Sequence, residues 1–296
     1  MTTRRQFIHS TIASLIAAGA AGSSKLTALQ SGPASPALKA PVGLQLYSLR
    51  HIFKKGDVAG TLAMVKGWGI NQVELAGTYG MSGADFTALL KKTGLEAVST
   101  HGDFTRLAEA ADSVITDART FGVQYLGCAW IPHKERFGLS DAENAAQVFN
   151  EAGRKAKAAG LRFFYHIHGY EFQPGPAGTL FDTIATKTDP SLVSFEMDVF
   201  WAARGGADPV ALFRKYPGRF ELTHLKDMEK GLATGDPTGH APDESNVPLG
   251  QGQIDWPAVL REANGQGVKY HFIEDEHPQS EKQIPVSLKY LADLKL

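Results

Sequence analysis

The sequence predicts an α/β fold in which eight parallel strands close into a single (β/α)8 TIM barrel. From Pro41 onward, eight short apolar runs alternate with amphipathic segments, which is typical of repeated βα units. Several amphipathic segments end in a glycine that would stop a helix, such as Gly94 and Gly160. Four of the later apolar runs end in a residue that can bind a metal, at the point where barrel enzymes place their chemistry.

The elements follow one another in a regular order. Strands are expected at 42–48, 71–76, 95–101, 123–130, 161–168, 192–198, 219–225 and 268–274. Helices are expected at 58–67, 83–93, 105–121, 141–159, 179–186, 209–216, 256–266 and 281–294. An open doubly wound sheet is the alternative fold, but it usually has a Gly-rich phosphate loop after its first strand. The sequence Tyr47-Ser48-Leu49-Arg50 is not such a loop.

Composition fits one globular domain over residues 41–296. The chain has 296 residues, of which 43% are hydrophobic and 21% charged, and no composition break after Pro41 marks a second domain. The net charge of −1, with scattered Lys and Arg, offers no basic surface for nucleic acid. The single cysteine, Cys128, excludes an internal disulfide and argues against a Cys-based metal site.

Residues 1–40 have the features of a twin-arginine-type export signal followed by a linker. Arg4 and Arg5 precede a short apolar stretch at 12–21, and a Gly, Ser, Pro and Ala tract follows it. This pattern predicts a periplasmic or otherwise exported protein. The apolar stretch is too short to span a membrane, so we expect no stable membrane insertion. An amphipathic start to a cytosolic protein is the alternative.

Polar residues at the ends of the later strands are candidates for a metal site. His166 and His168 end one run, and Asp198, His224 and Glu274 lie at or near the ends of the next three. Since the C-terminal ends of barrel strands meet at one mouth, these side chains should lie close together. Imidazole and carboxylate groups at such a point predict a divalent-metal enzyme.

Alternation along the strands separates inward from outward side chains. Asp198 shares a face with Glu196, and His224 shares a face with Phe220. If these faces point into the barrel, the polar residues gather in the last layer at its mouth. The first three strands would add four residues to the same mouth: Gln45, Tyr47, Glu74 and His101.

Seven strings carry a family resemblance over residues 41–296. They are VGLQLYS from Val42, VEL from Val73, YHIHGYEF from Tyr165, EMDVFW from Glu196, HLKD from His224, PLGQGQIDW from Pro248 and IE from Ile273. In this order they resemble the sugar phosphate isomerase/epimerase family. That family belongs to the xylose isomerase-like TIM barrels, which also include endonuclease IV.

The resemblance implies one divalent metal ion, Mn, Mg, Co or Zn, at the barrel mouth. By position, Asp198, His224 and Glu274 match the family's ligands on strands six, seven and eight. Ketose epimerases of the family have a glutamate on strand five, whereas this chain has His166 and His168 there, so either histidine is a candidate fourth ligand. Glu274 is implied to move a proton as well as bind metal, and His168 is the candidate partner acid/base.

Other residues have two interpretations each. A buried carboxylate at Glu74 needs a partner, so Glu74 either supports a metal ligand or acts on the substrate. Trp201 forms a pocket wall that could stack on a sugar. Lys226 and Asp227 are expected to pair with each other or with the barrel rim, and Lys226 as a donor to a substrate oxygen is the alternative. Further substrate-binding candidates are Gln45, Tyr47 and His101.

The expected reaction begins with removal of a proton beside a sugar carbonyl. A divalent ion polarises the carbonyl, and a carboxylate or imidazole takes the proton to give an enediolate. Returning the proton elsewhere makes an isomerase or epimerase, and losing a β-substituent makes a lyase (eliminase). The expected partner is a small-molecule carbohydrate, with unphosphorylated sugars or keto-glycosides favoured for an exported enzyme, and a homo-oligomer is compatible with the sequence.

Two alternatives come from other functional classes. An endonuclease IV-like phosphodiester hydrolase would need two or three metal ions and a basic groove, and the net charge of −1 argues against the groove. A sugar-binding protein could keep the barrel and lose the reaction. Bound metal without turnover on any carbohydrate would favour the second alternative.

The export signal predicts that the mature chain begins between Gly22 and Pro41, because signal peptides are cleaved after the apolar region. N-terminal sequencing of protein from the native envelope fraction measures this directly. An intact Met1 on protein from the soluble cytosol would contradict it.

Overall fold

The structure is a computed structural model that describes residues 37–176 and 178–296. Its barrel strands are β1 (Val42–Gln45), β2 (Gln72–Leu75), β3 (Glu96–His101), β4 (Tyr125–Cys128), β5 (Arg162–His166), β8 (Val193–Asp198), β9 (Phe220–Leu225) and β12 (Tyr270–Ile273). They form a closed barrel in the order β1-β12-β9-β8-β5-β4-β3-β2, and every neighbouring pair is parallel. The predicted (β/α)8 fold and all eight predicted strands are confirmed.

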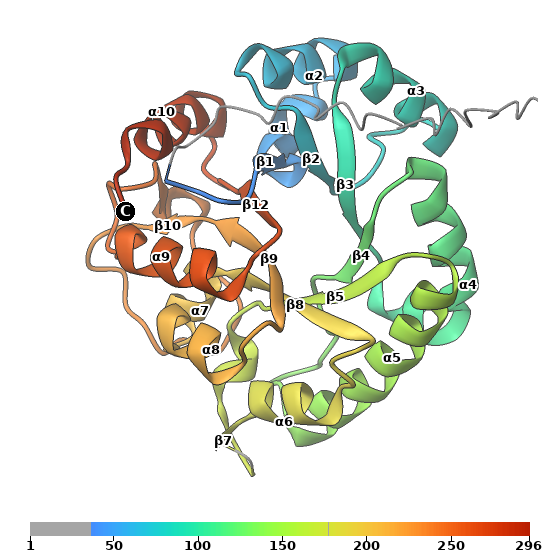
Figure 1. Cartoon of the computed structure of the whole chain (residues 1–296), viewed down its shortest axis with the longest axis vertical. Helices are drawn as coiled ribbons and strands as arrows, with labels where there is room; N and C mark the ends of the chain where they lie inside the picture. The colour runs from blue at the N-terminus through green and yellow to red at the C-terminus, as the bar shows by residue number, and fades with distance from the viewer. Residues whose placement is uncertain (1–36, 177) are drawn as a thin grey trace, which may run out of the picture.

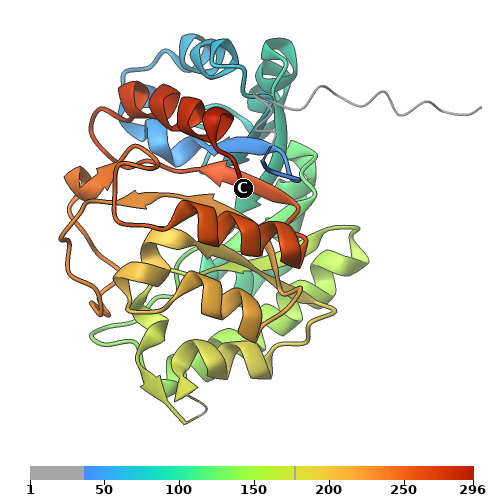
Figure 2. The ribbon, with the colours of Figure 1, turned by 60° about the vertical axis from the view of Figure 1, so that its left-hand side comes forward.

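Helices surround the strands, as Figures 1 and 2 show. The predicted helices are α2 (Val58–Gly67), α3 (Gly83–Thr93), α4 (Phe104–Phe121), α5 (Leu139–Ala158), α6 (Leu180–Lys187), α8 (Pro209–Lys215), α9 (Trp256–Gln266) and α10 (Ser280–Asp293). Glycines in the left-handed conformation end several of them, including α3 at Gly94 and α4 at Gly122. These stops let the chain turn directly into the next strand.

Several short elements at or near the barrel mouth were not predicted. They are η1 (Leu46–Leu49), α1 (Arg50–Phe53), η2 (Tyr170–Phe172), α7 (Val199–Arg204), η3 (Asp243–Ser245) and the hairpins β6 (Pro174–Gly175) with β7 (Gly178–Thr179) and β10 (Asp227–Met228) with β11 (Asn246–Val247). Each is shorter than the window in which hydrophobic periodicity can be recognised.

The middle of the barrel is filled by side chains. Val98, Tyr125, Phe164, Leu222 and Phe272 form one buried cluster inside the strands. Two inward-facing glycines leave room for the rings. A Cβ added to Gly127 would lie within 2.6 Å of Phe164 Cε1, and one added to Gly43 would lie 2.8 Å from Phe272 Cδ1. This packed layer of side chains closes the barrel below its mouth. The polar residues at the mouth therefore lie directly above apolar side chains.

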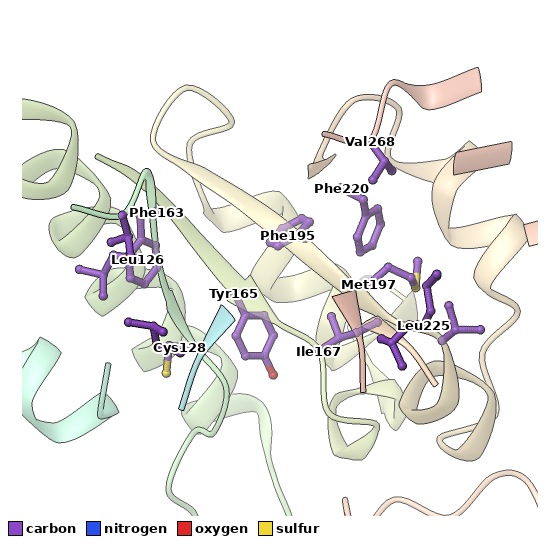
Figure 3. Close-up of a cluster of buried hydrophobic side chains, with 14 of the residues drawn as sticks. Leu126, Cys128, Phe163, Tyr165, Ile167, Phe195, Met197, Phe220, Leu225 and Val268 are labelled. Atoms are coloured by element: carbon purple, nitrogen blue, oxygen red, sulfur yellow. The ribbon is translucent and has the colours of Figure 1, made fainter. Parts of the chain in front are cut away.

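One expectation about strand faces is wrong. The register between β8 and β9 shifts, because Phe195 pairs with Phe220 whereas Glu196 pairs with Leu222. Glu221 is thus an extra residue in β9, and it breaks the alternation of inward and outward side chains along that strand. Phe220 therefore does not share the inward face of His224 but packs outside the barrel, 5.5 Å between ring centroids from Phe195 (Figure 3).

Asp227 holds the segment that follows β9. Its carboxylate accepts hydrogen bonds from the backbone N–H groups of Met228 (2.8 Å), Gly250 (2.8 Å) and Gly252 (3.1 Å). It also accepts one from Trp256 Nε1 at 2.9 Å. Of the two partners considered for Asp227, the structure shows the barrel rim and not Lys226. The glycine- and glutamine-rich string before α9 is thus fixed to the end of β9.

The export segment predicted at 1–40 falls outside the described residues up to residue 36. Among the helices that the structure describes, none combines the length and the apolarity required to cross a bilayer. Residues 41–296, expected as one domain, are described apart from residue 177.

The close packing of Phe164 against Gly127 can be tested by substitution. Gly127→Ala should destabilise the fold by about 1–3 kcal/mol, because its methyl group would overlap the ring of Phe164. Adding Phe164→Leu should restore part of the loss. Gly67→Ala is the matched control, since nothing lies within 4 Å of its added Cβ and α2 is helical there. Urea unfolding measures all three, and equal stability of Gly127→Ala and Gly67→Ala would contradict the packing argument.

Candidate metal centre

Four predicted ligands meet at the mouth of the barrel. Asp198 and His166 are the last residues of β8 and β5, His224 lies near the end of β9, and Glu274 follows β12 directly. His224 Nδ1 is 3.0 Å from Glu274 Oε2 and 3.6 Å from Asp198 Oδ2. His166 Nε2 is 4.0 Å from the same Asp198 oxygen. All four residues are buried.

The carboxylate of Asp198 is only half satisfied. Its Oδ1 accepts a hydrogen bond from Trp201 N at 2.8 Å and so caps α7. Its Oδ2 is buried without a hydrogen-bond partner, an arrangement that is costly unless a cation satisfies the oxygen. Atoms of Asp198, His224 and Glu274 that can bind a metal lie within 4.8 Å of one another. Two carboxylates with one or two imidazoles suit Zn²⁺ or Mn²⁺.

The second nitrogen of His224 is held by Glu74. His224 Nε2 lies 2.6 Å from Glu74 Oε1, which also accepts a hydrogen bond from Gln45 Nε2 at 2.6 Å. Ser99 Oγ donates to the other oxygen of Glu74. A carboxylate at Nε2 favours a proton on that nitrogen, so Nδ1, which faces Asp198 and Glu274, is the nitrogen that could bind a metal. Glu74 is fully buried and does not line the cavity, so it supports a ligand rather than contacting substrate.

Glu196 plays the same part for His166, and sequence reasoning missed it. Glu196 Oε2 lies 3.0 Å from His166 Nδ1, 3.3 Å from His224 Nε2 and 3.4 Å from His101 Nε2. Burial would raise the pKa of Glu196, but the surrounding imidazoles hold it well below its usual range. The sequence did contain a sign that Glu196 lies at the site, because Glu196 shares its strand face with Asp198.

These imidazoles offer a second group of atoms that could hold a metal: His101, His166, Glu196 and His224. Ions on both sides would require His166 and His224 to bind metal through both ring nitrogens, and each ring would then have to lose its remaining proton. Glu196 lies 3.0 Å from His166 Nδ1 and Glu74 lies 2.6 Å from His224 Nε2, where each carboxylate can accept that proton. The side of Asp198 and Glu274, where Asp198 Oδ2 has no hydrogen-bond partner, is therefore the candidate metal site.

Lys226 is a fixed positive charge behind this site. Its Nζ lies 3.4 Å from Glu274 Oε2, pairs with Glu276, and sits 5.0 Å from the ring centroid of Trp201. Burial would lower the pKa of Lys226, but Glu274 and Glu276 outweigh it and raise this pKa. Burial likewise would raise the pKa of Glu274, but Lys226 and His224 hold it well below its usual range. Both groups are therefore ionised at neutral pH.

His168 lies beside the metal group rather than in it. Its ring stacks on Trp201 with 4.6 Å between centroids, and its backbone N–H donates to Glu171 Oε1 at 2.8 Å. Burial lowers the pKa of His168 well below its usual value, helped by the charges of His166 and Lys226, so the imidazole is neutral at neutral pH. The structure thus places His166, not His168, next to Asp198.

A cavity of about 550 Å³ opens above these residues. Of the predicted substrate-binding residues, Gln45, Tyr47, His101 and Trp201 line it, whereas Lys226 lies behind Trp201. Among the polar and aromatic lining residues, five were not predicted: Trp130, His240, Asp243, Asn246 and Glu276. Trp130 ended a predicted strand and could have been considered. His240 and Asp243 lie in the long connection between β10 and β11, which has no periodic signal.

One protein family and several curated proteins are similar to this chain in sequence. The profile of one family, described as xylose isomerase-like TIM barrel, matches residues 62–294. An inosose dehydratase of Geobacillus kaustophilus is 31% identical over 100 residues, which are 32% of this chain and 30% of that protein. Inosose dehydratase 2 of Bacillus cereus is 26% identical over 178 residues, 57% of this chain and 56% of that protein. The matches thus span 30% and 56% of the lengths of these two relatives.

Solved structures extend the similarity over most of the chain. A sugar phosphate isomerase/epimerase from Parabacteroides distasonis is 25% identical, with a TM-score of 0.71, and the match covers 85% of this chain and 93% of that one. An IolI protein with a bound zinc atom is 14% identical with a TM-score of 0.64, over 85% of this chain and 94% of that one. The second similarity concerns the fold alone.

The candidate metal centre predicts that two substitutions weaken metal binding to different extents. Asp198→Ala should abolish stoichiometric metal binding, because it removes the unpartnered oxygen on which the ligands converge. Glu196→Gln should weaken metal binding by about 10- to 100-fold, as loss of a ligand's supporting carboxylate does. Elemental analysis and calorimetric titration with Zn²⁺ or Mn²⁺ measure both.

Asp293→Ala serves as the control, since Asp293 is exposed on α10 and its ion pair is with Lys289 of the same helix. Full metal occupancy in a folded Asp198→Ala variant would refute the assignment. Unchanged affinity in Glu196→Gln would show that Glu196 does not hold His166 in place for the metal.

Proposed function

Because the chain belongs to the xylose isomerase-like TIM barrel family, we propose that it is a divalent-metal-dependent enzyme that removes a proton beside a carbonyl of a carbohydrate and acts as an isomerase or epimerase. One observation carries the proposal. The unpartnered Oδ2 of Asp198 faces His166 and His224, with Glu274 beside them, at the base of a cavity of about 550 Å³. The similarity to an isomerase/epimerase at 25% identity supports it.

The residues that would hold the ion are His166, Asp198, His224 and Glu274. When bound, a divalent ion there would polarise a substrate carbonyl and acidify the neighbouring C–H. Glu274 lines the cavity and is unprotonated at neutral pH, so it can accept that proton. Lys226, next to the Glu274 carboxylate, supplies a positive charge that favours the negative charge of an enediolate.

His168 is the candidate partner that returns the proton. Its neutral imidazole lines the cavity, and its Nδ1 is buried without a hydrogen-bond partner. A neutral imidazole can take up a proton from one atom and give it to another. Stacking on Trp201 fixes the plane of the ring. Glu74 and Glu196 act through the histidines that they orient.

Dehydration is a second candidate for the same site. The curated relatives are named inosose dehydratases, and loss of water from an enediolate needs an acid to protonate the leaving hydroxyl. His101 lines the cavity. Burial would lower its pKa, but Glu74 and Glu196 raise it to about 10. His101 is therefore protonated at neutral pH and could be that acid.

Proton exchange tests the proposal without knowledge of the product. Metal-loaded protein should exchange deuterium from heavy water into an unlabelled ketose or inosose at the carbon beside the carbonyl. Glu274→Gln should keep much of its metal and lose exchange, and His168→Ala should slow exchange by about 100-fold or more without abolishing metal binding. Mass spectrometry follows the label and also distinguishes dehydration, because the product then lacks one water.

Glu281→Gln is the control, because Glu281 pairs with His51 and does not line the cavity. Exchange at the unmodified rate in Glu274→Gln would show that this carboxylate is only a ligand. Bound metal without exchange in any carbohydrate would favour a sugar-binding protein instead.

A further inference from the structure

Glu171 is a buried carboxyl group that has no part in the proposed reaction. Its side chain is fully buried and lies outside the cavity lining. Its Oε1 accepts hydrogen bonds from Tyr165 Oη at 3.0 Å and from the backbone N–H of His168 at 2.8 Å. Its Oε2 is buried without a hydrogen-bond partner. An apolar side chain of similar size would avoid the cost of that unpaired oxygen, but it could not accept the N–H of His168.

The hydrogen bond to Glu171 fixes His168 at the point where its strand has ended. β5 ends at His166, and the N–H of Ile167 still donates to Glu196 O on the neighbouring β8 at 3.2 Å. The next N–H along the chain, that of His168, donates to the Glu171 side chain instead. Backbone beyond a strand is more mobile than the strand itself, so this bond determines where the imidazole begins.

The turn between His168 and Glu171 packs closely against α7. Gly169 has a φ of +92°, and a Cβ added to it would lie 2.9 Å from Trp201 O. A Cβ added to Gly205, at the end of α7, would lie 2.5 Å from Gly169 O. This fit brings the His168 ring onto the ring of Trp201, with 4.6 Å between centroids. The stacking therefore depends on the path of the turn.

The same helix connects His168 to the metal centre. Asp198 Oδ1 accepts the N–H of Trp201 at 2.8 Å and so fixes the first turn of α7. The imidazole of His168 lies between this fixed tryptophan and the cavity that it lines. Its position relative to Asp198 is thus set on one side by Trp201 and on the other by Glu171.

From these contacts we propose that Glu171 is a positioning residue, which holds the backbone of His168 so that the imidazole stacks on Trp201 and faces the cavity. This inference rests on the proposed function, because it concerns the group proposed to return the proton. Glu171 lies outside the cavity and acts through His168.

Two conservative variants separate position from charge. Glu171→Gln keeps an oxygen at the same reach and removes the charge, whereas Glu171→Asp keeps the charge and shortens the side chain. Burial raises the pKa of Glu171 to about 7, although its hydrogen bonds lower it, so Glu171→Gln resembles the protonated form present near neutral pH. On metal-loaded protein with an unlabelled ketose or inosose, Glu171→Gln should keep the kcat of deuterium incorporation within about threefold. Glu171→Asp should lower it on the order of tenfold or more, with KM within about twofold.

The backbone N–H of His168 gives a readout that does not depend on activity. This amide hydrogen should exchange with heavy water on the order of tenfold faster in Glu171→Asp, and at a nearly unchanged rate in Glu171→Gln, because only the glutamine oxygen still reaches it. NMR spectroscopy of 15N-labelled, metal-loaded protein measures both rates. Full activity and full amide protection in Glu171→Asp overturn the inference. Loss of activity in Glu171→Gln with retention in Glu171→Asp also overturns it, since the charge itself would then be required.

A double variant shows whether Glu171 acts through His168. Added to His168→Ala, Glu171→Asp should lower the residual substrate exchange by no more than about twofold, because no imidazole remains to be positioned. A further loss on the order of tenfold overturns the inference.

Gln173→Ala is the matched control. Gln173 is buried next to the same turn, and its side chain donates to Tyr170 O at 2.8 Å and to Phe137 O at 3.3 Å. The variant should keep both kcat and the protection of the His168 amide within about threefold. Losses equal to those of Glu171→Asp would show that the stability of the turn is responsible, which overturns the positioning role.

Failure of this inference is distinguishable from failure of the proposed function. If no carbohydrate exchanges deuterium with the unmodified protein, the proposed function fails, and the amide measurement still decides whether Glu171 holds His168. If sugars exchange at the unmodified rate in both Glu171 variants, the reaction stands and the positioning role is wrong.

Discussion

Buried negative charge at the mouth of the barrel is the constraint on which the site depends. The four carboxylates are those of Glu74, Glu196, Asp198 and Glu274, and three imidazoles lie among them: His101, His166 and His224. Carboxylates removed from water are expensive unless each is paired. Imidazoles, Lys226, the hydroxyl of Ser99 and the backbone N–H of Trp201 contact these carboxylates, but two of the oxygens, Glu196 Oε1 and Asp198 Oδ2, are buried without a hydrogen-bond partner. Asp198 Oδ2 faces the other candidate ligands, where the proposed cation would complete the arrangement.

The apolar layer beneath the site makes that arrangement rigid. Phe164 and Phe272 occupy the space left by Gly127 and Gly43, so the strands that bear His166 and Glu274 are fixed from below. The outer core fixes them from the other side (Figure 3), where Tyr165 and Phe195 pack against the helices. Side chains that must meet within a few ångströms therefore rise from strand ends that cannot shift independently.

Strand periodicity was sufficient to predict the barrel and the meeting of the candidate metal ligands at its mouth. His166, Asp198, His224 and Glu274 lie at strand ends, and strand ends of a parallel barrel meet whatever the loops do. Glu196 was missed although it shares a strand face with Asp198, because the sequence does not show that three imidazoles surround it. Phe220 was misplaced because the register shift depends on pairing between two strands. His240 and Asp243 reach the cavity through a long connection whose path depends on tertiary contacts.

That connection has a consequence for how such a protein can diverge. The chain leaves β10 and returns at β11, while Asp227 ties the following segment to the end of β9 (Figure 1). The ends of the connection are fixed independently of its middle, which carries His240 and Asp243 to the cavity. Insertions and substitutions there can retune ligand choice while the metal ligands keep their positions. Related chains can therefore share one chemistry and differ in the compounds on which they use it.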